Sequence, residues 1–329
     1  MLVQGRLFRD ILVTNMDKQL EEISDLRFQK KVCELEIEEA YVVVICLVKR
    51  LVDSFEEAKG EKKLYYISPW FEKRKFLRNN LQNLGIYEIL ERILSEKQQS
   101  LKWIEEIEQE YLGTQNLYEK GVERFQEAMN QTDLPGEAIG IRTIRRYEDR
   151  TQETQNWEME KSWLKKENMS YEHIFQNVRA QAVLYSIDAA GKNKEIYKYR
   201  IFDLEIENWD NLNEKEFFSE YFLISSAIRL IMKQMRENQY DLRKLEQYAE
   251  IRIEGNYREM IIPVMLHIFV TEKAIPLKES LGIVKKVCGY SESEAVLADL
   301  KKCPELFVEE LVPGLMEKVV SLESVGKIG

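Results

Sequence analysis

The chain has 329 residues, of which 44% are hydrophobic and 32% charged, and its formal net charge is -10. This balance is typical of a soluble globular protein and excludes an intrinsically disordered chain. The acidic charge argues against binding to nucleic acid or to anionic membranes, because both partners attract basic surfaces.

The cysteine and histidine content limits the chemistry further. The four cysteines are Cys33, Cys46, Cys288 and Cys303. None of them forms a Cys-x-x-Cys spacing, so we interpret them as reduced and mostly buried thiols. Two histidines are too few to favour a His/Cys metal site. The longest apolar run, residues 41–48, is too short to span a bilayer, and the first residues lack an apolar segment of signal-peptide length. We therefore expect a cytoplasmic protein.

The first half of the chain alternates between helical and strand patterns. Residues 11–58 carry apolar side chains at three- and four-residue spacing, which predicts helices. The elements expected next are a strand at 64–67, helices near 71–83, 87–94, 101–110 and 117–131, a turn at 134–136 and a strand from 137 to 147. Gly85 is expected to end the first of these helices, because glycine accepts a positive φ.

The second half begins with β patterns at 179–187 and 195–206. Within 195–206 the alternation changes phase after Ile201, which predicts a bulge there. The elements expected next are a helix at 214–236, a strand at 248–253, a buried helix at 258–271 and a helical C-terminal third. Strands interspersed with helices indicate the α/β class. We expect one domain over 1–329, with a mainly helical lead-in (1–60) and an α/β body (61–325).

Five blocks of residues, in order along the chain, carry a resemblance to a known family. They are Tyr65-Tyr-Ile-Ser68 through Asn83-Leu-Gly85, Leu134-Pro135 with Gly140-Ile-Arg142, Asn156-Trp-Glu158, Glu220-Tyr-Phe-Leu-Ile-Ser225, and Tyr290 through Pro313-Gly-Leu315. Together they resemble the N-terminal half of the glycogen/α-glucan phosphorylases. The resemblance implies the N-terminal domain of a GT-B-type phosphorylase, a mixed sheet flanked by helices with helical N- and C-terminal parts, without the second domain.

The positions that align with the family's functional motifs hold other residue types. These degenerate positions are Trp70, Lys75, Thr114, Gln115, Asn116, Lys120 and Tyr257. Residues 112–120 stand where the family has a glycine-rich loop that lies against phosphate, and the bulky side chains of Leu112, Leu117 and Glu119 oppose a close approach of backbone N–H groups. Tyr257 stands in the slot of a substrate-contacting histidine. The family binds pyridoxal phosphate through a lysine of its second domain, so the resemblance implies no cofactor in this chain.

Other constellations have alternative interpretations. The carboxylates Glu105, Glu106, Glu108 and Glu110 could act as a glycosidase pair, but we favour a solvated acidic helix face. The cations Arg142, Arg145, Arg146 and Arg150 could bind an anion, but acidic neighbours favour a surface ion-pair patch. Sugar or partner contacts could come from Trp70, Trp157, Trp163 and Arg142, although such tryptophans are more often packing residues. His267 is expected to be a core or helix-edge residue.

These patterns favour a non-catalytic, phosphorylase-like protein with a protein-binding or regulatory role in α-glucan metabolism. One alternative is a glucan-binding module that neither hydrolyses nor phosphorolyses its ligand. A second alternative is a half-enzyme that another chain completes. The expected partner is a protein, such as a full-length phosphorylase or another glycogen enzyme, or a second copy of the chain, with α-glucan as a candidate ligand. Nucleic acid and membranes are not expected partners.

Overall fold

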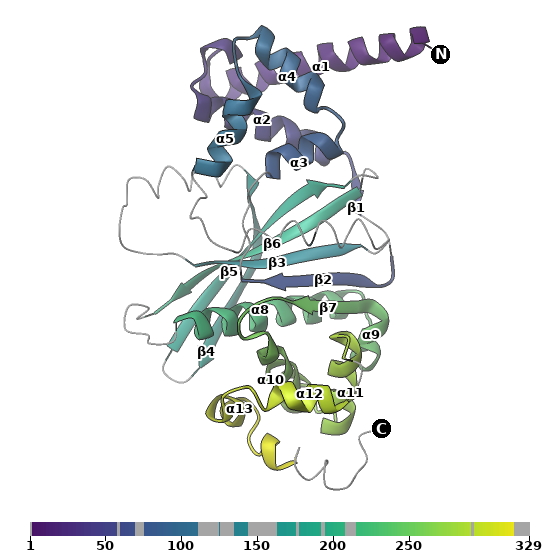
Figure 1. Ribbon diagram of the computed structural model, residues 1–329, viewed down its shortest axis with the longest axis vertical. Coiled ribbons are helices and arrows are strands. Elements are labelled where there is room, and N and C mark those ends of the chain that lie inside the picture. The colour runs from purple at the N-terminus through teal and green to yellow at the C-terminus, as the bar shows by residue number, and fades with distance from the viewer. Residues whose placement is uncertain are drawn as a thin grey trace.

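A mixed β-sheet lies between two helical layers in the computed structural model of the chain (Figure 1). The structure describes residues 2–57, 60–69, 76–110, 125, 135–143, 163–175, 178–191, 195–207, 215–290 and 293–318. Helical N- and C-terminal parts on the two sides of a mixed sheet confirm the α/β class that the sequence predicts.

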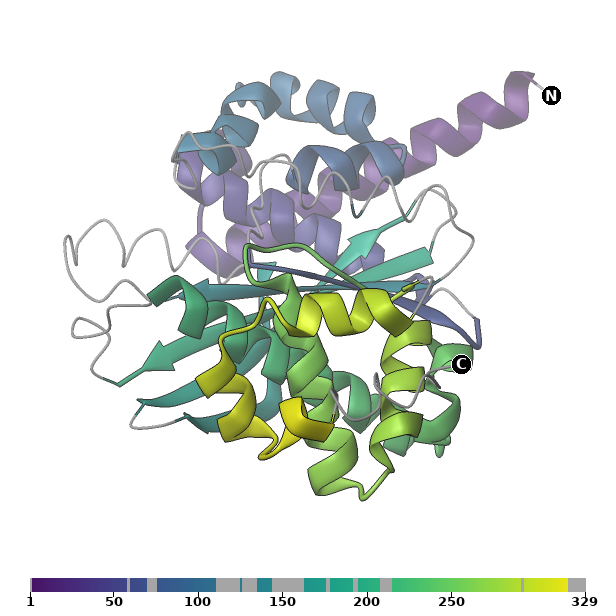
Figure 2. The ribbon, with the colours of Figure 1, turned by 60° about the horizontal axis from the view of Figure 1, so that its bottom comes forward.

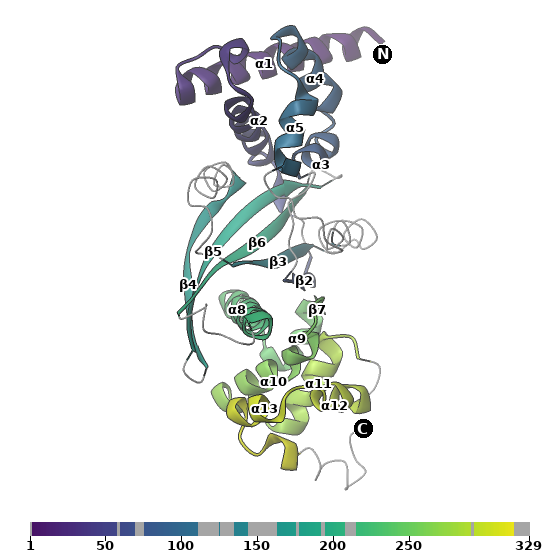
Figure 3. The same cartoon turned by 60° about the vertical axis from the view of Figure 1, so that its left-hand side comes forward.

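The N-terminal layer covers one face of the sheet, and its first helix extends beyond the rest of the layer (Figure 3). Its elements are α1 (Leu2–Phe28), η1 (Val32–Glu34), α2 (Ile37–Val52), α3 (Phe76–Asn83), α4 (Tyr87–Glu96) and α5 (Leu101–Glu110). The Glu39 carboxylate accepts a hydrogen bond from the Glu36 N–H at 3.0 Å and caps the start of α2. Asn83 fixes α3 to the sheet, because its side-chain amide donates to the Ala190 carbonyl at 2.7 Å.

The sheet combines a parallel part with an antiparallel edge. Its strands are β1 (Glu56–Glu57), β2 (Lys63–Ser68), β3 (Gly136–Thr143), β4 (Lys165–Phe175), β5 (Val178–Ala190), β6 (Glu195–Ile206) and β7 (Ala249–Ile253). The order is β4-β5-β6-β3-β2-β7, with β1 paired to β6 beside this path. The β4–β5 and β5–β6 pairs are antiparallel, and the pairs among β1, β2, β3, β6 and β7 are parallel.

The C-terminal layer covers the opposite face, where α8 lies against the strands and the remaining helices pack below it (Figures 2 and 3). Its elements are α8 (Lys215–Glu237), η3 (Leu242–Lys244), α9 (Leu245–Tyr248), η4 (Arg258–Met260), α10 (Ile261–Leu266), the π-helical turn η5 (His267–Glu272), α11 (Leu277–Val287), α12 (Ser293–Leu300) and α13 (Glu305–Leu311). Aromatic residues from α8, β4 and α13 form the contact between these parts, including Phe175, Tyr221 and Phe307 at 5.1 to 5.3 Å between ring centroids.

The bulge predicted near Ile201 is wrong. The β5–β6 and β3–β6 registers both run through Ile201 without a shift. The change of phase arises because β6 faces two cores. Tyr199 and Ile201 lie in the core of the N-terminal layer, whereas Phe202, Leu204 and Ile206 lie in the core of the C-terminal layer. Since odd and even residues of a strand point to opposite faces, a regular strand explains the whole pattern.

Other predicted boundaries were partly correct. The residue ranges 101–110 and 195–206 match α5 and β6 at both ends. The helix expected to reach residue 58 ends at Val52, and β3 begins at Gly136, where a turn was expected. Strand β4 was not predicted. The helix expected at 117–131 lies outside the described residues except for Phe125, which is helical and fully buried.

Among the helices that the structure describes, none combines the length and the apolar composition needed to cross a membrane. The four cysteines are free, and their environments range from exposed Cys33 to buried Cys303.

Candidate functional site

The carboxyl ends of the parallel strands β2, β3, β6 and β7 meet at one edge of the sheet. Ligands of open α/β sheets usually bind at this edge. Its described part comprises the carboxyl ends of these four strands and the turn that follows β7, residues 254–257. The segments that follow β2 and β3, residues 70–75 and 144–162, lie outside the described residues.

The turn after β7 is held by the carboxylate of Glu220, which comes from α8. Glu220 Oε1 accepts a hydrogen bond from the Asn256 N–H and Oε2 accepts one from the Tyr257 N–H, both at 3.0 Å. The Glu254 N–H donates to the Ile67 carbonyl at 2.9 Å and ties the turn to β2. Consecutive N–H groups that converge on one point form an anion-binding nest. Here the anion is supplied by the chain itself.

Gly255 allows this close approach of the turn to Glu220. Its φ is +148°, a conformation that residues with a side chain rarely adopt. A Cβ at this position would lie 2.3 Å from Glu220 Oε2, which is shorter than any real contact. Asn256 adds a side-chain hydrogen bond to Glu216, one turn before Glu220 on α8. The turn is therefore built around the carboxylate.

The charge of Glu220 has an unusual environment. The side chain is only 2% exposed, and burial raises the pKa of its carboxyl, while the two backbone N–H groups of the turn oppose that rise. In the described part of the chain it forms no ion pair with a lysine or arginine. Both oxygens of Glu220 already accept backbone hydrogen bonds. Glu220 therefore fixes the conformation of the turn and does not act as a free acid or base.

Tyr257 occupies the slot for which the resemblance implies a histidine. Its ring is half-buried and meets the Phe217 ring edge-on, with 5.4 Å between the centroids. It also packs against the core of the C-terminal layer. Tyr257 therefore packs against other apolar residues at the position where the resemblance implies a histidine.

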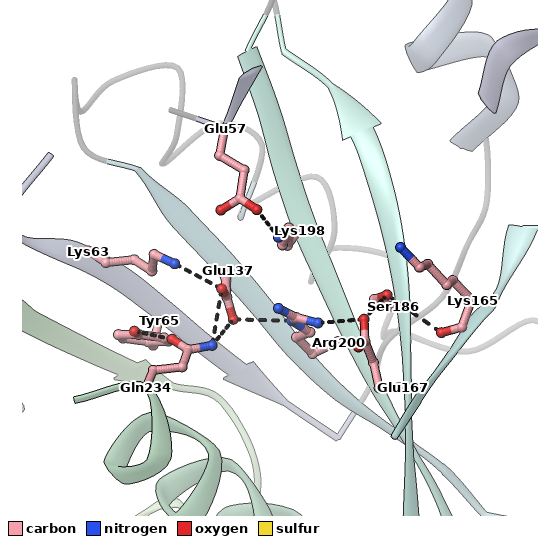
Figure 4. Close-up of polar contacts among 10 residues, drawn as sticks. All are labelled: Glu57, Lys63, Tyr65, Glu137, Lys165, Glu167, Ser186, Lys198, Arg200 and Gln234. Carbon is pink, nitrogen blue, oxygen red and sulfur yellow. Dashed lines mark hydrogen bonds and ion pairs between the residues drawn. The ribbon is translucent and has the colours of Figure 1, made fainter. Parts of the chain in front are cut away.

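A second buried carboxylate, Glu137, lies at the other end of the parallel strands, close to the start of β3 (Figure 4). It accepts hydrogen bonds from Lys63 Nζ at 2.9 Å, from Gln234 Nε2 at 3.0 and 3.2 Å, and from Arg200 Nε at 3.4 Å. Tyr65 Oη donates to Gln234 Oε1 at 2.6 Å and fixes the orientation of the amide.

The charges around Glu137 are balanced within the fold. Burial alone would raise the pKa of Glu137, but the cations Lys63 and Arg200 outweigh it and the pKa is lowered. Arg200 also binds Glu167 of β4 at 3.1 Å, and Ser186 donates to the same Glu167 oxygen at 2.5 Å (Figure 4). This network links β2, β3, β4, β5, β6 and α8, and its arrangement is that of a structural cross-link.

Most residues that the sequence singled out cannot be placed. Trp70, Lys75, Thr114, Gln115, Asn116, Lys120 and Trp157 lie outside the described residues, as do Arg145, Arg146 and Arg150. Arg142 belongs to β3, where its backbone pairs with Asp203, and its side chain lies outside the described part.

Trp163 has a packing environment rather than an exposed one. It is 2% exposed, its indole N–H donates to Tyr41 Oη at 3.1 Å, and its ring meets Phe76 edge-on at 4.8 Å. The buried ring of Trp163 cannot contact a sugar or a partner. Trp163 is therefore a packing residue.

The acidic face of α5 is not uniformly solvated, contrary to the expectation. Glu105 is 7% exposed, and its Oε2 accepts a hydrogen bond from Tyr87 Oη at 3.3 Å and lies 3.6 Å from Arg78. Burial raises the pKa of Glu105. Glu105 faces the neighbouring helices because it lies on the same side of α5 as the buried residues Leu101 and Ile104. His267 is a helix-edge residue as expected, with Nδ1 2.6 Å from the Leu311 carbonyl.

Comparison with known proteins supports the resemblance to the phosphorylases. Residues 210–325 match the family model for carbohydrate phosphorylase. The maltodextrin phosphorylase of Streptococcus pneumoniae is 26% identical over 344 residues, which cover 92% of this chain and 45% of that relative. The chain is phosphorylase-like. It spans less than half the length of this curated relative.

The phosphorylase-like segment 210–325 contains most of the assembly around the turn after β7. It includes α8 with Glu220, the strand β7 and the turn residues Gly255 to Tyr257. The contact of the turn with Ile67 of β2 lies outside this segment. Within the described residues, no group of three or more His, Cys, Asp or Glu side chains could hold a metal ion.

Sequence reasoning missed the roles of both buried carboxylates. Glu220 was noted only as part of a resembling block, although it stands in the apolar run Phe217-Phe-Ser-Glu-Tyr-Phe222, and an acid among buried aromatic residues must be hydrogen-bonded. Glu137 begins the apolar strand of residues 137–141, and this placement carried the same signal. Their partners come from distant segments and could not be read from spacing.

Proposed function

We propose that this phosphorylase-like chain does not catalyse phosphorolysis by itself and that it acts by binding a protein of α-glucan metabolism. The observation that carries the proposal is the turn after β7. Its two convergent N–H groups bind the carboxylate of Glu220, and Tyr257 packs on Phe217. The turn offers no free oxyanion site, because both of these N–H groups already donate to Glu220.

The chemistry of phosphorolysis explains why these features matter. Transfer of a glucosyl group to phosphate requires the phosphate to be bound close to the sugar, with a group that supplies or removes a proton. Backbone N–H groups at a loop of this kind are the common way to bind phosphate. An internal carboxylate on those donors repels a second anion. The turn therefore does not fit phosphate or the phosphate of pyridoxal phosphate, and we derive no step through that cofactor.

A binding role is consistent with the packing of the described residues. Helices pack on both faces of the described sheet, and each helical layer has its own core. A protein surface needs no catalytic groups, so loss of the reaction leaves this role intact. The proposed partner is a full-length phosphorylase or another enzyme that acts on α-glucan.

An activity assay tests the first half of the proposal. The purified chain is incubated with maltodextrin, inorganic phosphate and pyridoxal phosphate, and release of glucose 1-phosphate is measured. We expect the same signal as the enzyme-free blank. Release above the blank that Tyr257→Phe or Glu220→Gln abolishes would overturn the non-catalytic role. Release only after addition of a second, lysine-bearing phosphorylase chain would establish the half-enzyme.

Glucan binding is a second candidate because of one exposed aromatic side chain. Trp103 on α5 is 64% exposed, and a tryptophan of this exposure can stack on a sugar ring. If the chain is a glucan-binding module, glycogen in a native gel will retard it, and Trp103→Ala will remove the retardation. Equal migration with and without glycogen would exclude this candidate.

A further inference from the structure

Strand β4 forms one edge of the sheet, at the periphery of the molecule (Figure 3). Among the described strands it pairs only with β5, and its 11 residues make it long for an edge. The outer side of such a strand presents backbone N–H and C=O groups that can pair with another extended chain. Proteins usually block long edges with charges, proline or bulges.

The two halves of β4 differ in how well they are blocked. The first half has Lys165 and Lys166 and a register shift between Lys166 and Ser170. The second half, Ser170 to Phe175, pairs with β5 without a shift and carries Ile174, which is 66% exposed. Its one charged residue, Glu172, is paired with Arg179 of β5. The second half is therefore an open edge with an exposed apolar side chain.

A cavity of about 640 Å³ lies beside this open half, between β4, α8 and η5. Its charged lining residues are Arg229, Lys233, Arg236, Lys273, Glu172 and Glu272. Four cations therefore face two carboxylates, although the whole chain has a net charge of -10.

Internal ion pairs neutralise only part of this positive charge. Arg229 binds Glu272 at 2.8 Å, and Lys233 lies 3.6 Å from Glu237. Arg236 and Lys273 form no ion pair within the part of the chain that the structure describes. A group of opposite charge from outside would complete the cavity.

We propose that the second half of β4 accepts an extended acidic segment of a partner protein as an added strand, and that acidic side chains of this segment enter the cavity. The proposal rests on the protein-binding role proposed above and names the surface that performs it. Backbone pairing with β4 supplies affinity, while Arg236 and Lys273 select acidic side chains. Tyr171 lines the cavity, and its buried hydroxyl has no hydrogen-bond partner among the described residues. An incoming carboxylate would satisfy it after a small shift of the long cationic side chains.

Charge argues against a second copy of the chain as the occupant. Antiparallel pairing of β4 with its own copy places the first half of one strand opposite the second half of the other. Lys165 and Lys166 would then approach the cations of the cavity, and like charges at an interface oppose association. An acidic partner segment avoids this repulsion.

The test uses a fluorescein-labelled eight-residue peptide of alternating Glu and Val, with fluorescence anisotropy as the readout. Two further peptides serve as probes, one with Lys in place of Glu and one with N-methyl groups on alternate backbone amides. The double variant Arg236→Glu/Lys273→Glu replaces two of the four cavity cations by carboxylates. The control Lys18→Glu/Lys102→Glu makes the same change of net charge on α1 and α5. Ile174→Lys adds a blocking charge to the open edge.

We expect the acidic peptide to bind and the Lys peptide not to bind. Affinity should fall about tenfold or more with the N-methylated peptide, with the cavity variant and with Ile174→Lys, and should stay unchanged in the control. Equal binding by the cavity variant and the control would overturn the acidic selectivity. Equal binding of the N-methylated peptide would overturn strand addition, and no binding of the acidic peptide would overturn both. These outcomes are independent of the phosphorolysis assay, so the two proposals can fail separately.

Discussion

Glu137 and Glu220 are two carboxylates with the same burial, 2% exposed, at opposite ends of the parallel strands. Glu137 is surrounded by Lys63 and Arg200, and its pKa is lowered. Glu220 is bound only by backbone N–H groups and lies near Glu216 and Glu259, and its pKa is raised. The same type of side chain, on strand β3 and on helix α8, therefore has opposite electrostatic environments.

The difference shows how each end of the sheet is held together. At the end that contains Glu137, charged side chains from β2, β3, β4 and β6 neutralise one another, and neutral side chains from β5 and α8 complete the hydrogen bonds, so each contact depends on the others. At the end that contains Glu220, one carboxylate holds one turn through two backbone N–H groups, and Gly255 leaves room for this contact. This second arrangement allows Tyr257 to occupy its slot without any loss of the shape of the turn.

The largest expected effect comes from breaking the network around Glu137. Glu137→Leu leaves Lys63 and Arg200 facing an apolar group, and removal of one partner from a buried ion pair typically costs roughly 3–5 kcal/mol. We expect a loss of this size in the free energy of unfolding by urea titration. The double variant Glu137→Leu/Lys63→Met should recover part of it, because it removes one of the unpaired cations. A loss below about 1 kcal/mol in the single variant would contradict the cross-link interpretation.

His173 offers a comparison with a buried group that has no opposite charge beside it. It is 5% exposed, its Nε2 lies 2.8 Å from Ser226 Oγ, and burial, together with Arg229, lowers its pKa to about 4. The unfolded chain binds this proton near pH 6.5, so the group's stabilising contribution is complete above that pH and decreases as the pH falls from 6.5 to 4. The total loss is roughly 3 kcal/mol.

Urea titrations at several pH values measure this effect. We expect His173→Gln to retain the contact with Ser226 and to flatten the decrease in stability between pH 6.5 and 4. An unchanged pH profile would show that His173 titrates normally in the folded protein.

The smallest effect is expected at Glu220. Glu220→Gln keeps the shape of the side chain, but its NH₂ group faces a backbone N–H where an oxygen had accepted, and one unsatisfied buried donor costs roughly 1–3 kcal/mol. The raised pKa of Glu220 moderates the loss, since removal of the charge also removes a desolvation cost. Amide hydrogen exchange should accelerate at Asn256 and Tyr257 and remain unchanged in β3. Unchanged hydrogen-exchange rates at Asn256 and Tyr257 would contradict the conclusion that Glu220 fixes the turn.

Local patterns in the sequence were enough to predict most helices and the central strands. The range 101–110 was correct at both ends, because an apolar stripe at helical spacing defines it. Strand β4 was missed because Lys-Lys-Glu-Asn-Met-Ser-Tyr-Glu-His is too polar for a half-buried strand, and only the exposure of an edge explains it. The bulge near Ile201 was a wrong inference because one strand can serve two cores.

The candidate site was harder to predict from the sequence than the fold was. The resemblance identified the block Glu220-Tyr-Phe-Leu-Ile-Ser225 and the slot of Tyr257, but 36 residues separate Glu220 from Asn256 along the chain. No periodicity links two such segments. Contacts of this kind depend on how α8 is placed against β7, which is decided by the packing of the whole C-terminal layer.

The division of β6 between two cores also affects how the protein unfolds. The half of β6 that contains Tyr199 and Ile201 completes the core of the N-terminal layer, and the half with Phe202, Leu204 and Ile206 completes the core of the C-terminal layer. Neither layer can be cut away without exposing part of the same strand. We therefore expect the two layers to unfold in one cooperative transition, because removal of β6 would open the cores of both.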